Sequence, residues 1–194
     1  SRRDKVVCFA APEVGKSILV QQLASCVAAE VPFLRFAATC PGARVLFVAG
    51  EGDLDELQSR GRAMRERLPV GKDRLWYWPV PTSPMNTPAG FKRLVEFALR
   101  GGPALIVLAP IYALMAGSMK DDERAGDFLR NMNRLQHLTN AAILLTHHTH
   151  RPVRDDAGDF LDEGPEAYFG SILWHAWART MWAMRRDGAD PHNV

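Results

Sequence analysis

Short apolar runs alternate with longer amphipathic runs along this chain. The apolar runs predict β-strands at 5–9, 44–49, 74–80, 104–108 and 141–146. Strands that alternate with helical patterns are typical of a parallel sheet covered by helices on both faces. The pattern therefore predicts an α/β fold with a doubly wound, mostly parallel sheet.

Amphipathic runs predict the helices that would cover this sheet. They lie at about 16–29, 53–67, 88–100 and 121–138. Asp53 is suited to cap the second helix, because its short carboxylate can accept from free backbone N–H groups. Asp121 opens an acidic first turn in the fourth helix, where the helix dipole favours negative charge.

Length and composition favour one domain in a reducing compartment. At 194 residues with 47% hydrophobic side chains, the chain can bury one substantial core, so we expect a single domain over 1–194. Its three cysteines form no C-x-x-C pair and suit free thiols in the cytoplasm. No apolar run approaches the ~20 residues of a membrane span. The chain opens almost directly on its first strand and stops soon after a strand-like run, as a fragment lacking its flanking domains would.

The segment KVVCFAAPEVGKS, residues 5–17, runs a short strand into a Gly-Lys-Ser that opens a helix. Backbone N–H groups of such a loop and the positive end of the helix dipole bind phosphate. Lys16 would reach the β- and γ-phosphates, and the Ser17 hydroxyl would ligate Mg²⁺. The match to GxxxxGK[ST] is incomplete, because Ala10 replaces the first glycine. We expect nucleotide contacts from Ala10, Ala11, Pro12, Glu13, Val14, Gly15, Lys16, Ser17 and Ile18.

Residues that follow the other strands are the next candidates, since ligands of parallel sheets bind at the carboxyl ends of the strands. Glu51, between two glycines, is placed to orient or deprotonate a water molecule. Histidines follow the fifth strand in the run THHTH at 146–150, where an imidazole could face a γ-phosphate. The same histidines could instead bind a transition metal together with Asp155, Asp156 or Asp159, or have a purely structural role.

The combined pattern resembles the RecA-like hexameric ATPases, and most closely the RepA-like branch of plasmid and phage replicative helicases. The resemblance is carried by residues 10–17, 46–51, 105–110, 121–138, 144–148 and 170–179. It implies a RecA-like P-loop NTPase core that binds ATP and Mg²⁺ and assembles into a homo-oligomeric ring on single-stranded DNA. It makes Glu51 the catalytic base and His148 the sensor residue, with His147 as second choice. Arg179 would be a finger that acts on the ATP of a neighbouring subunit.

Two features depart from this family pattern. The family has a magnesium-shell aspartate after the fourth strand, where this chain has Ala109. A methyl group cannot hydrogen-bond a magnesium-bound water, so turnover should suffer even if phosphate binding survives. The chain is then a degenerate member or a hydrolysis-impaired variant, or another carboxylate compensates. The stretch 149–169, where such motors carry a DNA-contacting loop, holds two arginines but six acidic residues, which disfavours contact with phosphate.

Three functions remain open from the sequence. The leading hypothesis is an ATP-hydrolysing helicase or helicase-like motor of plasmid, phage or mobile-element replication. The second is a nucleotide-dependent scaffold or regulatory module with slow or absent hydrolysis because of Ala109. The third is a P-loop small-molecule kinase, which the acidic 149–169 stretch disfavours because it makes a poor basic lid.

Overall fold

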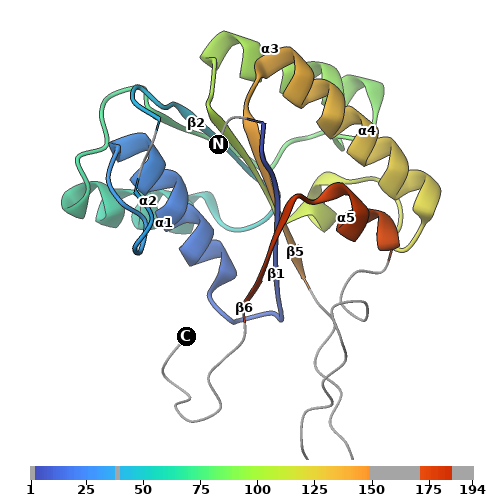
Figure 1. Ribbon diagram of the computed structural model, residues 1–194, viewed down its shortest axis with the longest axis horizontal. Helices are drawn as coiled ribbons and strands as arrows, with labels where there is room; N and C mark the ends of the chain where they lie inside the picture. The colour runs from blue at the N-terminus through green and yellow to red at the C-terminus, as the bar shows by residue number, and fades with distance from the viewer. Residues whose placement is uncertain (1–2, 38–39, 149–170, 185–194) are drawn as a thin grey trace, which may run out of the picture.

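Parallel strands form one sheet with helices on both faces (Figure 1). The computed structural model describes residues 3–37, 40–148 and 171–184, and in these ranges the sheet has six strands. They are β1 (Lys5–Ala10), β2 (Val45–Ala49), β3 (Leu75–Pro79), β4 (Leu105–Ala109), β5 (Ala142–His148) and β6 (Thr180–Met184). Their spatial order is β3-β2-β4-β5-β1-β6, and each neighbouring pair is parallel. The predicted doubly wound α/β fold is confirmed.

Helices cover the two faces of the sheet unequally. They are α1 (Lys16–Ala29), α2 (Leu54–Arg67), α3 (Pro88–Gly101), α4 (Asp122–Thr139), α5 (Ile172–Trp177) and the 3-10 helix η1 (Ile111–Leu114). Helices α1 and α2 lie on one face, and α3, α4 and α5 lie on the other (Figure 1).

Short polar residues and positive-φ residues set the ends of these helices. The side chains of Asp53, Thr87 and Asp121 accept hydrogen bonds from backbone N–H groups in the first turns of α2, α3 and α4. Gly102 and Asn140 end α3 and α4 in the left-handed conformation that stops a helix. The helices predicted from the sequence accordingly agree with those observed to within a residue or so at each end.

Alternate residues of the central strands pack against opposite helix layers. In β4, Ile106 and Leu108 belong to the core under α3 and α4, whereas Val107 and Ala109 belong to the core under α1. A parallel strand buried on both faces has no polar side, and its sequence is a continuous apolar run. That is why these strands stand out in the sequence.

The structure goes beyond the prediction at four elements. Strand β5 runs on to His148, beyond the predicted end at 146, so both His147 and His148 lie within the strand. Helix α5, the turn η1 and the edge strand β6 were not predicted as separate elements. The stretch 149–169, with the acidic residues considered as metal ligands, lies outside the described residues. No helix in the described ranges has the length and hydropathy to cross a membrane.

Candidate active site

The loop between β1 and α1 leads into a helix whose first backbone N–H groups have no intrahelical partner. Gly15 precedes α1 with φ at 86°, a left-handed conformation that glycine adopts without strain, and it has no side chain to cap the helix. The first intrahelical bond runs from Leu19 N to Gly15 O at 3.0 Å. The N–H groups of Lys16, Ser17 and Ile18 therefore precede the hydrogen-bonded ladder, and the first turn carries no acidic residue. This geometry suits an anion.

Lys16 is almost fully buried beside the end of β5. The residue is 4% exposed, and its Nζ lies 3.2 Å from Nδ1 of His148. An ammonium can only donate, so Nδ1 of His148 accepts and the imidazole hydrogen lies on Nε2. Burial lowers the pKa of Lys16, while nearby Cys8 and Glu51 act in the opposite direction.

His148 connects this lysine to Glu51. Nε2 of His148 lies 3.7 Å from Oε1 of Glu51. Burial lowers the pKa of His148, the Lys16 charge lowers it further, and Glu51 opposes both effects. The imidazole is therefore neutral at neutral pH, which agrees with its acceptor role toward Lys16.

The other carboxylate oxygen of Glu51 has a partner that the sequence analysis missed. The hydroxyl of Tyr112 donates to Oε2 of Glu51, and the Tyr112 ring lies 5.3 Å from the His148 ring between centroids. Tyr112 sits in η1, in the segment that follows β4. The rule that ligands bind after the ends of parallel strands could have drawn attention to it, although no motif marks it.

These four side chains come from adjacent strand ends. The strands β2, β4, β5 and β1 are neighbours in that order, and Ala10 is paired with His148 at the carboxyl end of β1 and β5. Residue Gly50 allows the Glu51 loop to approach η1, because a Cβ at this position would lie 2.9 Å from Leu114 Cγ and 3.0 Å from Pro110 O. The sheet thus brings Lys16, Glu51 and His148 close together at the carboxyl ends of its strands.

Ala109 is the last residue of β4 and faces the α1 side of the sheet. It is 6% exposed and packs in the same core cluster as Cys8 of β1 and Val20 of α1. Its methyl group offers no oxygen to a metal ion or to a metal-bound water. Among the described residues, no group of three His, Cys, Asp or Glu side chains could hold a metal ion.

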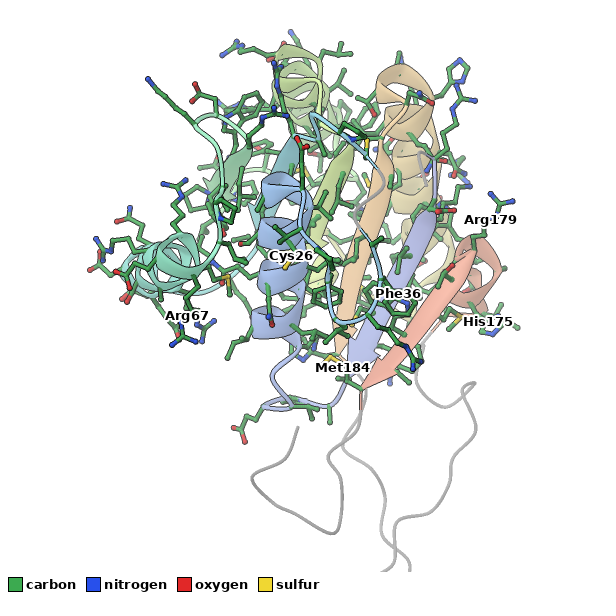
Figure 2. The ribbon with its side chains drawn as sticks, turned by 60° about the vertical axis from the view of Figure 1, so that its left-hand side comes forward. Cys26, Phe36, Arg67, His175, Arg179 and Met184 are labelled. Carbon is green, nitrogen blue, oxygen red and sulfur yellow. The ribbon has the colours of Figure 1, made fainter. Side chains whose placement is uncertain are left out.

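Two predicted site residues lie elsewhere. His147 alternates with His148 in β5 and points to the opposite face, where its ring lies 6.0 Å from that of Trp174. Arg179 precedes β6 and lies at the end of the sheet where the strands begin, since its N–H donates to the O atom of Lys5, the first residue of β1, at 2.9 Å. Its side chain is 74% exposed and lies 3.8 Å from Asp4. Figure 2 shows Arg179 and Met184 at opposite ends of β6, and Met184 is the residue paired with Ala10.

Comparisons with known proteins agree with this geometry. The family described as "AAA domain" matches residues 2–152. A solved structure of a KaiC-like protein from the hyperthermophilic archaeon Pyrococcus horikoshii OT3 is similar with a TM-score of 0.62 and 12% identity. The match covers 96% of this chain and 74% of that one, and at this identity it supports the fold alone. None of the curated proteins matches the sequence. The chain belongs to the AAA domain family. With its phosphate-type loop, the P-loop of residues 10–17, and its parallel sheet, it is a nucleotide-binding ATPase of the RecA-like fold.

Proposed function

We propose that this chain is the ATP-binding core of a ring-forming motor, a helicase or helicase-like ATPase of plasmid, phage or mobile-element replication. The convergence of Lys16, Glu51 and His148 beside the phosphate-type loop carries the proposal. A buried ammonium, a carboxylate and a neutral imidazole on adjacent strand ends are the groups that phosphoryl transfer to water needs.

Lys16 would bind the phosphates. Its Nζ already has one acceptor, Nδ1 of His148 at 3.2 Å, and ATP would offer β- and γ-phosphate oxygens in its place. The N–H groups at the start of α1, which precede the helical hydrogen bonds, would hold the same phosphates. A phosphate oxygen only accepts, so His148, released from Lys16, would have to present a ring N–H in order to bond the γ-phosphate.

Glu51 would act as the base. Its side chain is 42% exposed, so water reaches it, and its Oε1 faces His148 and the lysine beyond. A carboxylate there can take the proton of a water molecule that attacks the γ-phosphate. The Ser17 hydroxyl would ligate Mg²⁺, which would neutralise phosphate charge when bound.

Ala109 supports a second candidate, a nucleotide-dependent scaffold that hydrolyses ATP slowly or not at all. The position lies on the α1 side of the sheet, buried among Cys8 and other apolar side chains, and in place of a magnesium-shell carboxylate it carries only a methyl group. ATP binding would then stabilise an assembly rather than drive a motor. Retained binding without turnover distinguishes this candidate from the motor.

The ring and the arginine finger belong to the motor proposal. Arg179 lies where the strands begin, and Lys16 of the same chain lies beyond the other end of the strands. Any contact of Arg179 with ATP therefore has to involve a neighbouring copy. Single-stranded DNA is the proposed track of the motor, and a motor of this kind is expected to hydrolyse ATP faster when DNA is present.

Lys16→Ala tests the nucleotide site directly. Titration with a fluorescent ATP analogue should show a loss of affinity of about 100-fold or more, because a buried charged donor to phosphate is removed. Lys92→Ala, which removes an exposed lysine of α3, is the matched control and should bind normally. Unchanged affinity in Lys16→Ala would contradict the proposed site. ATP hydrolysis measured at several protein concentrations, with and without single-stranded DNA, then separates the motor from the scaffold.

A further inference from the structure

We propose that Tyr112 is a positioning residue for Glu51, in that it holds the carboxylate so that only Oε1 faces the phosphate side of the site. The inference rests on the proposed function, because it assigns a role in ATP hydrolysis. It starts from the hydrogen bond that the Tyr112 hydroxyl donates to Oε2 of Glu51.

The turn that carries Tyr112 is anchored on both sides. Ile111 and Leu114 of η1 are buried in the core, whereas Tyr112 between them is 47% exposed. Leu114 O accepts from Met85 N at 2.7 Å. The Tyr112 side chain therefore projects from a fixed backbone.

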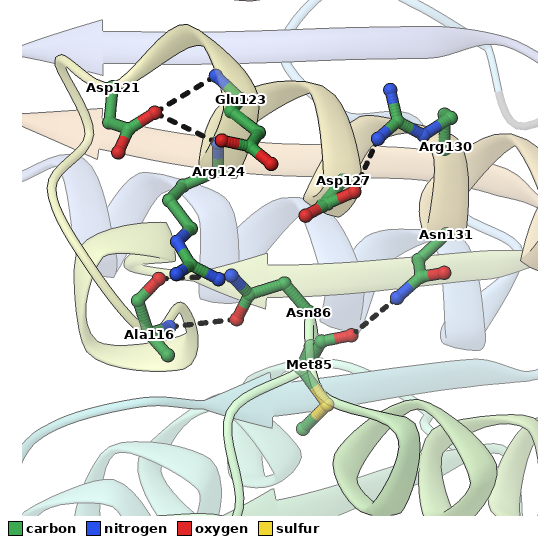
Figure 3. A network of polar contacts seen from close by, with 9 residues as sticks. All are labelled: Met85, Asn86, Ala116, Asp121, Glu123, Arg124, Asp127, Arg130 and Asn131. Carbon is green, nitrogen blue, oxygen red and sulfur yellow. Dashed lines mark hydrogen bonds and ion pairs between the residues drawn. The ribbon is translucent and has the colours of Figure 1, made fainter.

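A network of polar contacts fixes the chain just after the turn (Figure 3). The side chain of Asn86 donates to Ala116 O at 2.9 Å and accepts from Ala116 N at 2.8 Å. Asn131 of α4 donates to Met85 O at 3.0 Å. These bonds tie the segment after β4 to the loop before α3 and to α4, so the position of Tyr112 is set by three elements.

The loop that carries Glu51 packs against the same turn. Gly50 N donates to Ala109 O at 2.8 Å, and a Cβ on Gly50 would lie 3.0 Å from the Cβ of Ala113. The Tyr112 ring also lies against His148, at 5.3 Å and an interplanar angle of 56°. Glu51 is thus held between a tyrosine hydroxyl on one oxygen and the His148 side on the other.

This arrangement matters because a glutamate side chain has three rotatable bonds and its oxygens are interchangeable in solution. A donor that occupies Oε2 removes most of that freedom before the substrate arrives, which is how a group fixed by a hydrogen bond contributes to rate. Tyr112 itself does not accept the proton, since the base is Glu51. Its loss should lower kcat without weakening ATP binding.

Tyr112→Phe is the test, because it keeps the ring against His148 and removes only the hydroxyl. We expect kcat for ATP hydrolysis to fall about 10-fold, the rate equivalent of one hydrogen bond to a charged group, with KM unchanged within about 2-fold. Tyr77→Phe is the matched control: it removes a hydroxyl that accepts from Gln21 of α1 at 3.0 Å, outside the site, and should leave kcat unchanged. If the natural chain is too slow to measure, both substitutions are made in Ala109→Asp.

A second measurement examines the contact without turnover. Urea unfolding of Tyr112→Phe, Glu51→Ala and the double variant should show non-additive effects, with a coupling of several-fold in the unfolding equilibrium. Three outcomes would overturn the positioning role while leaving the ATPase intact. They are a kcat of Tyr112→Phe that is unchanged or increased, a KM that rises about as much as kcat falls, and unfolding effects that add. If the parent binds ATP but neither it nor Ala109→Asp hydrolyses it, the motor proposal fails, and this role fails with it.

Discussion

Replacing Gly50 by alanine should loosen the contact between the Glu51 loop and η1. The added Cβ would lie 2.9 Å from Leu114 Cγ, 3.0 Å from Ala113 Cβ and 3.0 Å from Pro110 O, where ordinary contacts begin near 3.4 Å. Leu114 is 1% exposed and cannot swing away, and Pro110 O belongs to the backbone. Relief therefore requires a shift of the loop, and such overpacking typically costs about 1–3 kcal/mol.

Urea unfolding followed by tryptophan fluorescence measures this cost. With an m-value of about 2 kcal/mol/M, a loss of 2 kcal/mol lowers the midpoint by about 1 M. The glycine control is Gly61→Ala in α2, whose Cβ would meet Tyr77 Cε2 at an ordinary 3.7 Å. It should raise the free energy of unfolding by about 0.5–1 kcal/mol, because alanine is the better helix former. A Gly50→Ala chain as stable as the parent would refute the close packing, and with it the rigid link between Glu51 and Tyr112.

Three further outcomes are expected. Ala109→Asp should raise Mg²⁺-dependent ATP hydrolysis, because its carboxylate would hydrogen-bond a magnesium-bound water beside Ser17; a flat rate in a folded variant means that Ala109 is not the metal-shell position. In that background, Arg179→Ala chains and Glu51→Gln chains, each inactive alone, should recover ATP hydrolysis when they are mixed. An arginine finger supplied by a neighbouring subunit raises the hydrolysis rate on the order of 10³-fold. Co-assembly without recovery would make Arg179 a surface residue. His148→Asn should make the free energy of unfolding less sensitive to acid. The pKa of His148 is lowered below 6.5 in the folded chain, so the unfolded chain binds the proton first as the pH falls. The free energy of unfolding of the parent is therefore complete above about pH 6.5 and falls below that pH by up to about 1.4 kcal/mol per pH unit. Urea unfolding between pH 5 and 8 decides this, and equal slopes for both chains would contradict the burial of His148 beside Lys16.

The fold could be predicted largely because its strands are buried on both faces. A strand such as β4, with Ile106 and Val107 facing different helix layers, leaves a continuous apolar run that is hard to mistake. The edge strand β6 and the short helix α5 carry weaker signals. Strand β6 is half exposed, and α5 has only six residues, which is too short for a helical period to show, although Trp174 and Trp177 are buried in the core.

The candidate site could be predicted in part. Parallel strands place their carboxyl ends at one edge, so Lys16, Glu51 and His148 could be brought together from the sequence alone. The preference for His148 over His147 came from the family resemblance and not from periodicity, because the predicted strand stopped before both, and their opposite directions follow from their places in β5. Tyr112 was missed because its role depends on how η1 packs against Gly50, which leaves no periodic pattern.

The place of β1 in the sheet has a consequence for synthesis of the chain. β1 is made before the other strands of the described ranges, yet its two neighbours, β5 and β6, are made after all the others. Lys5, for example, has to wait for Ile143 before its strand is paired. A ribosome-bound chain therefore exposes the apolar segment Val6-Val7-Cys8-Phe9 until β5 has been made, while β2, β3 and β4 can already associate. The phosphate-binding loop that follows β1 is thus translated before the strands that hold β1 in the sheet.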